Sequence, residues 1–227
     1  MNKKTAEKIV NKSILVLLLV LVFLVPIILG WQETLWNTFT LPKVVIFRSL
    51  VLLLLFLGAV KVFLSSKLVL RGPGPLFLFL GFWVFAWILS SGLSLDPGLS
   101  LWGKYDRLQG LSTLVYYPLL FLFLLLFLGK YTTIKKILAF MALASAVVAG
   151  YGIIQYVGWD PLVWSENTSF PGGRIISTLG QPNFAAHFLI LVMPLTVFLF
   201  FFARRKIVKI FLLFLFLAQF SALVFTF

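Results

Sequence analysis

Cysteine is absent from this sequence, histidine occurs once, and only six residues are acidic. Without cysteine there is no disulfide framework and no thiolate metal cluster, so we expect neither a metal ion nor another cofactor. Charged residues make up only 11% of the chain, whereas hydrophobic residues make up 62% and the mean hydropathy is +1.11. A chain of 227 residues cannot bury that much apolar surface in one water-soluble core. The protein is therefore expected to lie in lipid.

Long apolar runs predict the architecture. A helix needs about 20 residues to cross roughly 30 Å of hydrocarbon. The sequence contains seven candidate spans, at residues 13–30, 44–64, 75–92, 114–128, 137–157, 183–202 and 207–227, of which the fourth is the shortest. Lysines precede the first run as in a signal peptide, but it is long and lacks a small-residue cleavage site, so we interpret it as a retained span. The predicted fold is one all-α polytopic membrane domain over residues 1–227, with about seven transmembrane helices.

Basic residues predict the topology, because lysine and arginine favour cytoplasmic loops. With the N-terminus in the cytoplasm, fourteen of the 19 basic residues fall inside, and the five outside are Lys43, Arg48, Lys104, Arg107 and Arg174. Among the acids, Glu7 falls inside and the others outside. The positive charge thus follows membrane orientation, which argues against nucleic-acid binding.

Three outer loops, at residues 31–43, 93–113 and 158–182, hold most of the remaining polar chemistry. Tryptophans gather in or beside them, at Trp31, Trp36, Trp83, Trp87, Trp102, Trp159 and Trp164. An indole at this depth ordinarily anchors a helix at the boundary between headgroups and hydrocarbon. Stacking against sugar rings is the alternative for an outward-facing site.

The loop at residues 93–113 contains an Asp-Pro-Gly turn signal, followed by Gly103 and Gly110 on either side of the stretch KYDRLQ. This spacing predicts a short, sharply bent element between two spans. Its cations are Lys104 and Arg107, with Asp106 between them. Either Asp106 pairs with one cation while the other reaches lipid phosphates, or the two cations form a subsite for an anionic group at the outer surface.

The passage RIISTLGQPNFAAHF places several polar residues where a hydrophobic helix begins. Pro182 suits the first turn of a helix, since it lacks the N–H that would have no partner there. Ser177, Thr178 and Gly180 precede it, and we expect them to leave backbone N–H groups available. Together with Arg174 and the partial positive charge of a helix N-terminus, these groups predict an anion site that faces outward at the membrane boundary.

Polar residues inside the sixth span have two interpretations. Asn183 and His187 are four residues apart, so they share one face of the helix and form a polar stripe just below the surface. Alternatively, each hydrogen-bonds a neighbouring helix or interfacial water and has a structural role.

Small residues in the fifth span, Ala142, Ala146 and Gly150, recur every four positions. This spacing predicts close helix packing. Gln155 and Gln219 are isolated amides to which the sequence assigns no role.

Two of these polar passages together form a family pattern. SLWGKYDRLQGL follows the third span, and GYGIIQYVGWDP and RIISTLGQPNFAAHFL come two spans later. Their order and motifs resemble the O-antigen ligase and polymerase superfamily. Members commonly show an outer loop of the form Gly-x-x-x-Arg-x-x-Gly, matched here by Gly103, Arg107 and Gly110. They also show Arg…Thr-x-Gly-Asn-Pro-Asn-x-x-Ala, whose counterparts are Arg174, Thr178, Gly180, Pro182, Asn183 and Ala186, with Gln181 replacing the first asparagine. The motifs cover residues 96–195, and the layout of spans agrees over the whole chain.

The resemblance implies a metal-independent glycosyltransferase that takes a glycan from an undecaprenyl-pyrophosphate carrier at the outer face of the cytoplasmic membrane. The acceptor would be a lipid, a protein hydroxyl or another glycan. Arg174, helped by Arg107, would be catalytic by neutralising the pyrophosphate leaving group, because a guanidinium fork matches phosphate oxygens. Substrate binding would fall to Lys104, Thr178, Gly180, Asn183 and His187.

Length is the main departure from the family. Its members usually continue to ten or more spans, and a large outer loop of their C-terminal half carries a histidine proposed to activate the acceptor. His187 does not match that histidine, because it lies in the passage that follows Pro182. The present sequence ends at SALVFTF, so we expect the N-terminal part of a longer protein, with part of a donor site and without catalysis of its own.

Two other functions stay open: a membrane transporter and a non-catalytic lipid-handling scaffold. No acidic residue falls within a predicted span. Proton-coupled transport is therefore disfavoured, because it usually needs ionisable groups at mid-membrane.

Overall fold

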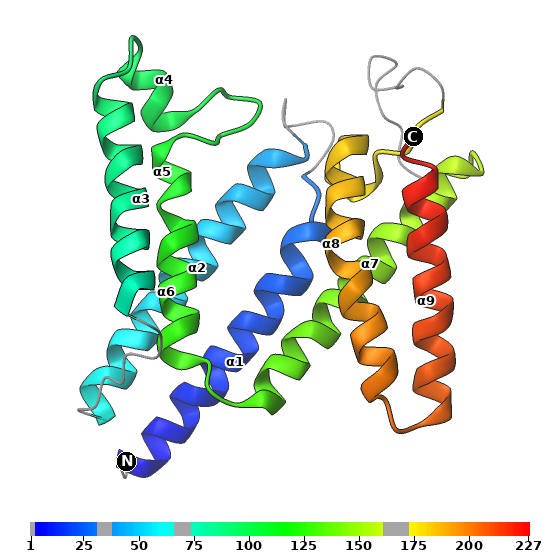
Figure 1. Ribbon diagram of the computed structural model, residues 1–227, viewed down its shortest axis with the longest axis horizontal. Coiled ribbons are helices and arrows are strands. Elements are labelled where there is room, and N and C mark those ends of the chain that lie inside the picture. Colours follow the sequence, from blue (N-terminus) through cyan, green and yellow to red (C-terminus); the bar gives the residue numbers. More distant parts are fainter. Residues whose placement is uncertain (1–2, 31–37, 66–73, 161–172) are drawn as a thin grey trace. The chain divides into compact units, whose positions relative to one another are not determined.

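The computed structural model describes residues 3–30, 38–65, 74–160 and 173–227. Helices dominate these ranges, and no strand occurs in them (Figure 1). In chain order they are α1 (Lys3–Ile27), α2 (Thr40–Ser65), α3 (Gly74–Gly92), α4 (Pro97–Trp102), α5 (Leu111–Leu114), α6 (Tyr116–Phe127), α7 (Tyr131–Tyr156), the 3-10 helix η2 (Ser177–Leu179), α8 (Pro182–Phe202) and α9 (Lys206–Val224).

Six helices in the described ranges are long and apolar enough to cross a membrane: α1, α2, α3, α7, α8 and α9. Each coincides with a predicted span, although α1 and α7 begin well before theirs, at Lys3 and Tyr131. The chain is thus a multi-span helical membrane protein, and the predicted all-α fold class is confirmed.

The fourth predicted span is shorter than the others and is divided. Its apolar stretch runs from Leu111 to Phe127, and its helical hydrogen bonding is interrupted at Val115, between α5 and α6, where the backbone keeps right-handed helical dihedrals. The physical reason is Pro118, which has no N–H to donate to the carbonyl of Leu114 and would clash with it in a continuous helix. Pro118 instead lies in the first turn of α6, where a missing N–H costs nothing.

The chain divides into two compact units. The first contains Met1–Leu21 and Thr40–Ile134, and the second contains Val22–Phe39 and Lys135–Phe227. The single domain expected over residues 1–227 stays a prediction.

In the first unit, α2 packs against α6, and α3 is linked to α5 through the short helix α4. Helix α3 is poorly covered: Leu80 is its buried residue, whereas Leu78, Phe79 and Phe82 are exposed. The ring centroids of Trp83 and Trp87 lie 4.1 Å apart on this helix. Exposed apolar side chains on a span-length helix are the expected surface for hydrocarbon.

In the second unit, α7, α8 and α9 pack together, with α8 and α9 as an antiparallel pair (Figure 1). One end, here called the Arg174 end, contains the end of α7, the start of α8 and the last residues of the chain. The other, here called the basic end, contains Lys135, the end of α8, and Arg204 and Arg205 before α9.

The predicted small-residue stripe on α7 is confirmed in part. Ala142 is buried with Leu199 and Leu212, and Ala146 packs against the same cluster. Gly150, however, faces open space, because a Cβ placed there would have no atom within 4 Å. The two alanines therefore serve helix packing, and Gly150 does not.

Candidate functional site

The segment that carries Arg174 is anchored at the Arg174 end by buried neighbours. Ile175 and Ile176 are buried, and the amide of Ile175 donates to the carbonyl of Phe225 over 3.1 Å. Gly152 of α7 makes room for this segment, because a Cβ there would lie 2.6 Å from Cδ1 of Ile175. The backbone position of Arg174 is therefore set by packing on α7 and on the end of the chain.

The polar groups of Ser177 and Thr178 hold η2 in place. The buried Ser177 hydroxyl donates to the carbonyl of Val148 over 2.6 Å, and the Thr178 hydroxyl donates to that of Pro26 over 2.9 Å. The amide of Ser177 donates to Oε1 of Gln155 over 2.7 Å. The prediction that this amide is available to a ligand is thus wrong, because a side-chain carbonyl accepts from it. Substrate binding by Thr178 stays a prediction.

Gln155 is held in turn by an acidic residue at the end of α7. Its Nε2 donates to Oδ2 of Asp160 over 2.9 Å, and the Tyr151 hydroxyl donates to Oδ1 over 2.7 Å. The carboxylate therefore orients the amide that fixes Ser177. Sequence reasoning missed Gln155, because its partners lie 5 and 22 residues away and no local motif connects them.

Gly180 joins η2 to α8 in a backbone conformation and a space that suit glycine. Its φ is +76°, in the left-handed region, and a Cβ would lie 2.3 Å from Cγ of Phe39. Gln181 then occupies the N-cap position of α8 without a side-chain capping hydrogen bond, and Pro182 occupies the first turn as predicted. These residues direct Asn183 back toward Arg174.

Arg174 is half-buried, and two protein oxygens hold its guanidinium group. Nε donates to the carbonyl of Thr226 over 2.6 Å, and Nη2 donates to Oδ1 of Asn183 over 3.2 Å. Among the described residues no protein group accepts from Nη1. The structure thus brings two predicted site residues together and leaves an N–H edge of the guanidinium for a ligand.

The acceptor carbonyl of Thr226 is placed by the end of α9. The ring of Phe225 stacks on that of Tyr156 with centroids 3.6 Å apart. The Thr226 hydroxyl donates to the carbonyl of Leu223 over 2.6 Å. Sequence reasoning missed Thr226, since nothing in an apolar C-terminal run marks a carbonyl as a partner for arginine.

His187 is exposed on α8, about one turn beyond Asn183. None of the hydrogen bonds that the described residues form around Arg174 involves its imidazole. A substrate-binding role for His187 stays a prediction.

In the first unit, two glycines close the loop that carries Lys104 and Arg107. A Cβ on Gly103 would lie 2.5 Å from the amide nitrogen of Gly110, and a Cβ on Gly110 would lie 2.4 Å from that of Gly103. The carbonyl of Lys104 accepts from the amides of Arg107 and Leu108, over 3.0 and 2.7 Å. The predicted sharp bend is therefore present, and the side chains of Lys104 and Arg107 are exposed at its tip.

Arg48 supports this loop from within α2. Its Nη2 donates to the hydroxyl oxygens of Ser112, over 3.1 Å, and of Thr113, whose own hydroxyl donates to the carbonyl of Leu108. The guanidinium also lies 5.8 Å from the ring centroid of Tyr116. The sequence carried a signal for a special role of Arg48, because an arginine inside an apolar span is rare and usually has a specific partner.

A buried polar cluster lies midway along the second unit. Nε2 of Gln219 donates to the hydroxyl oxygens of Ser145, over 2.6 Å, and Thr196, over 3.0 Å. All three residues are fully buried and come from α9, α7 and α8. Hydrogen bonds of this kind join helices in lipid, so Gln219, which had no assigned role, is a packing residue.

The other predicted positions divide between the two units. Arg107 and Lys104 belong to the first unit and Arg174 to the second. Trp102 and Trp159 are exposed, whereas Trp31, Trp36 and Trp164 lie outside the described residues. No three His, Asp or Glu residues in the described ranges are grouped so that they could hold a metal ion.

The fold and the site together define a class: a multi-span helical membrane protein with a hydrogen-bonded arginine at one end of a three-helix unit. Comparison of the chain with protein-family models, curated proteins and solved structures finds no match. The family resemblance therefore rests on the two motifs.

Proposed function

We propose that this membrane protein binds the pyrophosphate of an undecaprenyl-pyrophosphate-linked glycan at the outer face of the cytoplasmic membrane. It would thereby provide the donor site of a metal-independent glycosyltransferase of the O-antigen ligase and polymerase type. The observation that carries the proposal is the guanidinium of Arg174, which Thr226 and Asn183 hold, and whose Nη1 donates to no acceptor among the described residues. A held guanidinium suits phosphate oxygens, which accept charge-assisted hydrogen bonds in a defined geometry.

In the proposed reaction, an acceptor hydroxyl oxygen attacks the anomeric carbon of the donor sugar. The bond between that carbon and the pyrophosphate oxygen breaks, the hydroxyl proton is released to water at the outer face, and negative charge develops on the leaving group. Arg174 stabilises this charge without rearranging, because its guanidinium is already in position. Asn183 acts as a positioning residue, since its Oδ1 accepts from Nη2 of Arg174.

The exposed cations of the Gly103–Gly110 loop are proposed as further contacts to the anionic carrier. Arg107 and Lys104 lie at the tip of this loop. The close approach of Gly103 and Gly110 and the hydrogen bonds of Arg48 hold the loop in shape. Thr178, Gly180 and His187 complete the proposed donor site around Arg174. The acceptor is proposed to be a lipid, a protein hydroxyl or a further glycan, and the transporter and scaffold functions stay alternatives.

The proposal is tested by donor binding to the purified chain in lipid nanodiscs. The probe is an undecaprenyl-pyrophosphate glycan, and the variants are Arg174→Ala and Arg174→Lys. The control is Lys136→Ala, which also removes one positive charge but lies on α7 away from the Arg174 end. Loss of a charge-assisted contact costs about 1–3 kcal/mol, so Arg174→Ala should weaken binding by about 5- to 150-fold. Arg174→Lys should recover part of the loss, because lysine keeps the charge without the fork. Lys136→Ala should bind like the wild type.

Equal binding by wild type and Arg174→Ala, in protein of unchanged thermal stability, would contradict a donor site at Arg174. A wild-type chain that does not bind the donor would contradict the proposal as a whole. A double-mutant cycle with Arg107→Ala then tests the second arginine. A coupling of about 0.5 kcal/mol or more indicates that both arginines serve one ligand, whereas additive losses indicate independent roles.

A further inference from the structure

At the basic end of the second unit, a cavity of about 430 Å³ opens between α7, α8 and α9. Three basic side chains line it: Lys135 of α7, and Arg204 and Arg205 of the link between α8 and α9. No acidic residue is among its described lining residues. The cavity thus carries uncompensated positive charge at the side of the membrane predicted to be cytoplasmic.

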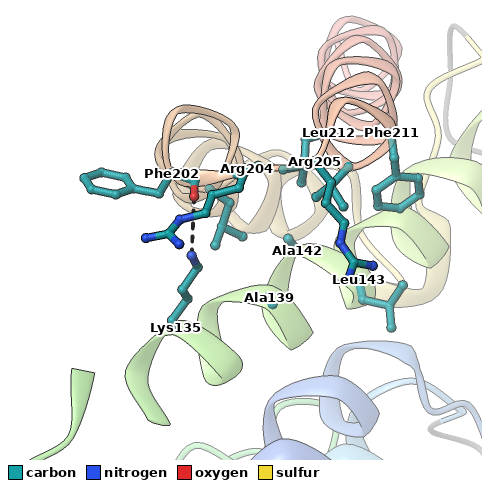
Figure 2. Close-up of a pocket in the computed structure, with 12 residues that line it drawn as sticks. Lys135, Ala139, Ala142, Leu143, Phe202, Arg204, Arg205, Phe211 and Leu212 are labelled. Atoms are coloured by element: carbon teal, nitrogen blue, oxygen red, sulfur yellow. Dashed lines mark hydrogen bonds between the residues drawn. The ribbon is translucent and has the colours of Figure 1, made fainter. Parts of the chain in front are cut away.

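The cations lie around the cavity rather than together on one helix (Figure 2). Lys135 and Arg204 lie on one side and Arg205 on the other, with Ala139 and Ala142 between them (Figure 2). Nζ of Lys135 donates to the carbonyl of Phe202 over 3.5 Å, at the end of α8. An anion placed in the mouth of the cavity could therefore be approached by cations from both sides.

The remainder of the cavity is apolar. Ala139 and Ala142 leave a hollow in α7, and Leu143 and Phe211 stand beside it, 42% and 51% exposed. A free phosphate ion would gain nothing from these side chains. An acidic peptide would lose the hydration of its backbone groups on such a surface without finding partners for them. A hydrocarbon chain, in contrast, needs no polar partner there.

We propose that this cavity binds an anionic phospholipid of the adjoining leaflet. The phosphate lies among Lys135, Arg204 and Arg205, and the upper part of one acyl chain lies on Ala139, Leu143 and Phe211. Guanidinium groups match phosphate oxygens, and basic cavities between membrane helices on the cytoplasmic side are suited to acidic headgroups. This site is independent of the donor site proposed above, because it lies at the opposite end of α8 from Asn183.

The first experiment measures lipid binding to the purified chain by native mass spectrometry. Phosphatidylglycerol and phosphatidylcholine with identical acyl chains are compared on the wild type, on Arg204→Gln/Arg205→Gln, and on Lys136→Gln/Lys206→Gln. The second pair removes the same charge near the same end of the helices from residues outside the cavity lining. We expect the wild type to prefer phosphatidylglycerol by about tenfold, the arginine pair to abolish that preference, and the control pair to retain it within about twofold.

A second variant separates a lipid site from a site for free phosphate. Ala139→Trp fills the hollow and leaves every charge in place. Since Ala139 is exposed, the substitution is compatible with folding. It should weaken phosphatidylglycerol binding about fivefold or more, because one Trp removes most of the apolar contact area, and inorganic phosphate should not displace the lipid.

Several results would overturn the proposal. Equal retention of the two lipids by the wild type would exclude recognition of the anionic headgroup. Displacement of the lipid by inorganic phosphate, or full binding by Ala139→Trp, would reduce the site to a phosphate-binding surface. If the arginine pair and the control pair lose phosphatidylglycerol binding equally, the preference for this lipid comes from the overall charge of the protein and not from the cavity.

Discussion

The two ends of the second unit use arginine in opposite ways. At the Arg174 end, the guanidinium is held by the oxygens of Thr226 and Asn183, and the adjoining backbone is buried. At the basic end, Arg204 and Arg205 are exposed in the short link before α9 and line an open cavity. A guanidinium fixed by protein oxygens is prepared for one ligand geometry, whereas exposed ones can follow the varied positions of a lipid headgroup.

The difference has a cause in the local composition. Ser177, Thr178, Gln155 and Asn183 supply donors and acceptors at the Arg174 end, so this end is joined by side-chain hydrogen bonds. The cavity at the basic end is lined by apolar residues and cations, which offer few acceptors. The guanidinium that protein oxygens hold thus lies where hydrogen-bond acceptors are supplied, and not where charges are most numerous.

The largest expected effect comes from Gly180→Ala, which should break the Arg174 end and spare the basic end. The left-handed backbone costs about 1–2 kcal/mol for a residue with a Cβ, and the contact with Phe39 adds about 1–3 kcal/mol of overpacking. We expect a total loss of about 2–5 kcal/mol in the free energy of unfolding, measured by denaturant unfolding in detergent.

The matched control is Gly150→Ala, since a Cβ at Gly150 meets no atom within 4 Å. It should be neutral or stabilising by up to about 1 kcal/mol, because alanine favours helix more than glycine does. If Gly180→Ala costs no more than Gly150→Ala, the tight contact with Phe39 is not a feature of the folded protein.

Next in size is Gln219→Ala, which acts midway between the two ends. It removes two interhelical hydrogen bonds and leaves a cavity among fully buried residues, so we expect a loss of about 2–3 kcal/mol in thermal unfolding measurements. Gln219→Leu retains the volume and should cost about 1 kcal/mol or less. A loss for leucine as large as that for alanine would show that the hydrogen bonds of the amide, and not the volume of the side chain, account for the stabilisation.

A smaller, local effect is expected from Arg48→Met, which extends the comparison to the first unit. Without the contacts to Ser112 and Thr113, the Gly103–Gly110 loop should open more often, at a cost of about 1 kcal/mol. Limited trypsin digestion should then cleave after Lys104 and Arg107 about fivefold faster. Lys61→Met, at the other end of α2, serves as the control. If trypsin cleaves the two variants at the same rate, Arg48 does not stabilise the Gly103–Gly110 loop.

An effect of similar size, on ligand binding rather than on stability, is expected from Asn183→Asp, which keeps the shape of the Asn183 side chain and adds a negative charge beside Arg174. A carboxylate in place of Oδ1 would partly neutralise the guanidinium, so donor binding should weaken by about fivefold, near 1 kcal/mol. Asn183→Ala removes the positioning contact without adding charge, and its loss should be smaller. Tighter binding by Asn183→Asp would mean that the ligand at this end is not an anion.

Much of the fold could be predicted because it follows from the chemistry of single segments. Apolar length located the helices α1, α2, α3, α7, α8 and α9, since a backbone in lipid must satisfy its own hydrogen bonds. Pro182 marked the start of α8 for an equally local reason. The division of the fourth span could have been predicted too, because Pro118 cannot continue a helix from Leu114.

The candidate site could be predicted only in outline. Its principal residue, Arg174, and its neighbour Asn183 stand in one short passage, so the motif suggested both. The partners that decide how they behave, Thr226 and Gln155, come from distant parts of the chain. The availability of the Ser177 amide was wrongly predicted for this reason: the side chain that occupies it lies on another helix.

By itself, then, the sequence determined the membrane class, the helical spans and the passages in which polar chemistry gathers, because hydropathy and proline act over a few consecutive residues. The tertiary structure alone decided that protein oxygens hold Arg174, that Gln219 joins three helices, and that Lys135, Arg204 and Arg205 surround one cavity. Those properties depend on acceptors and neighbours that only packing brings together.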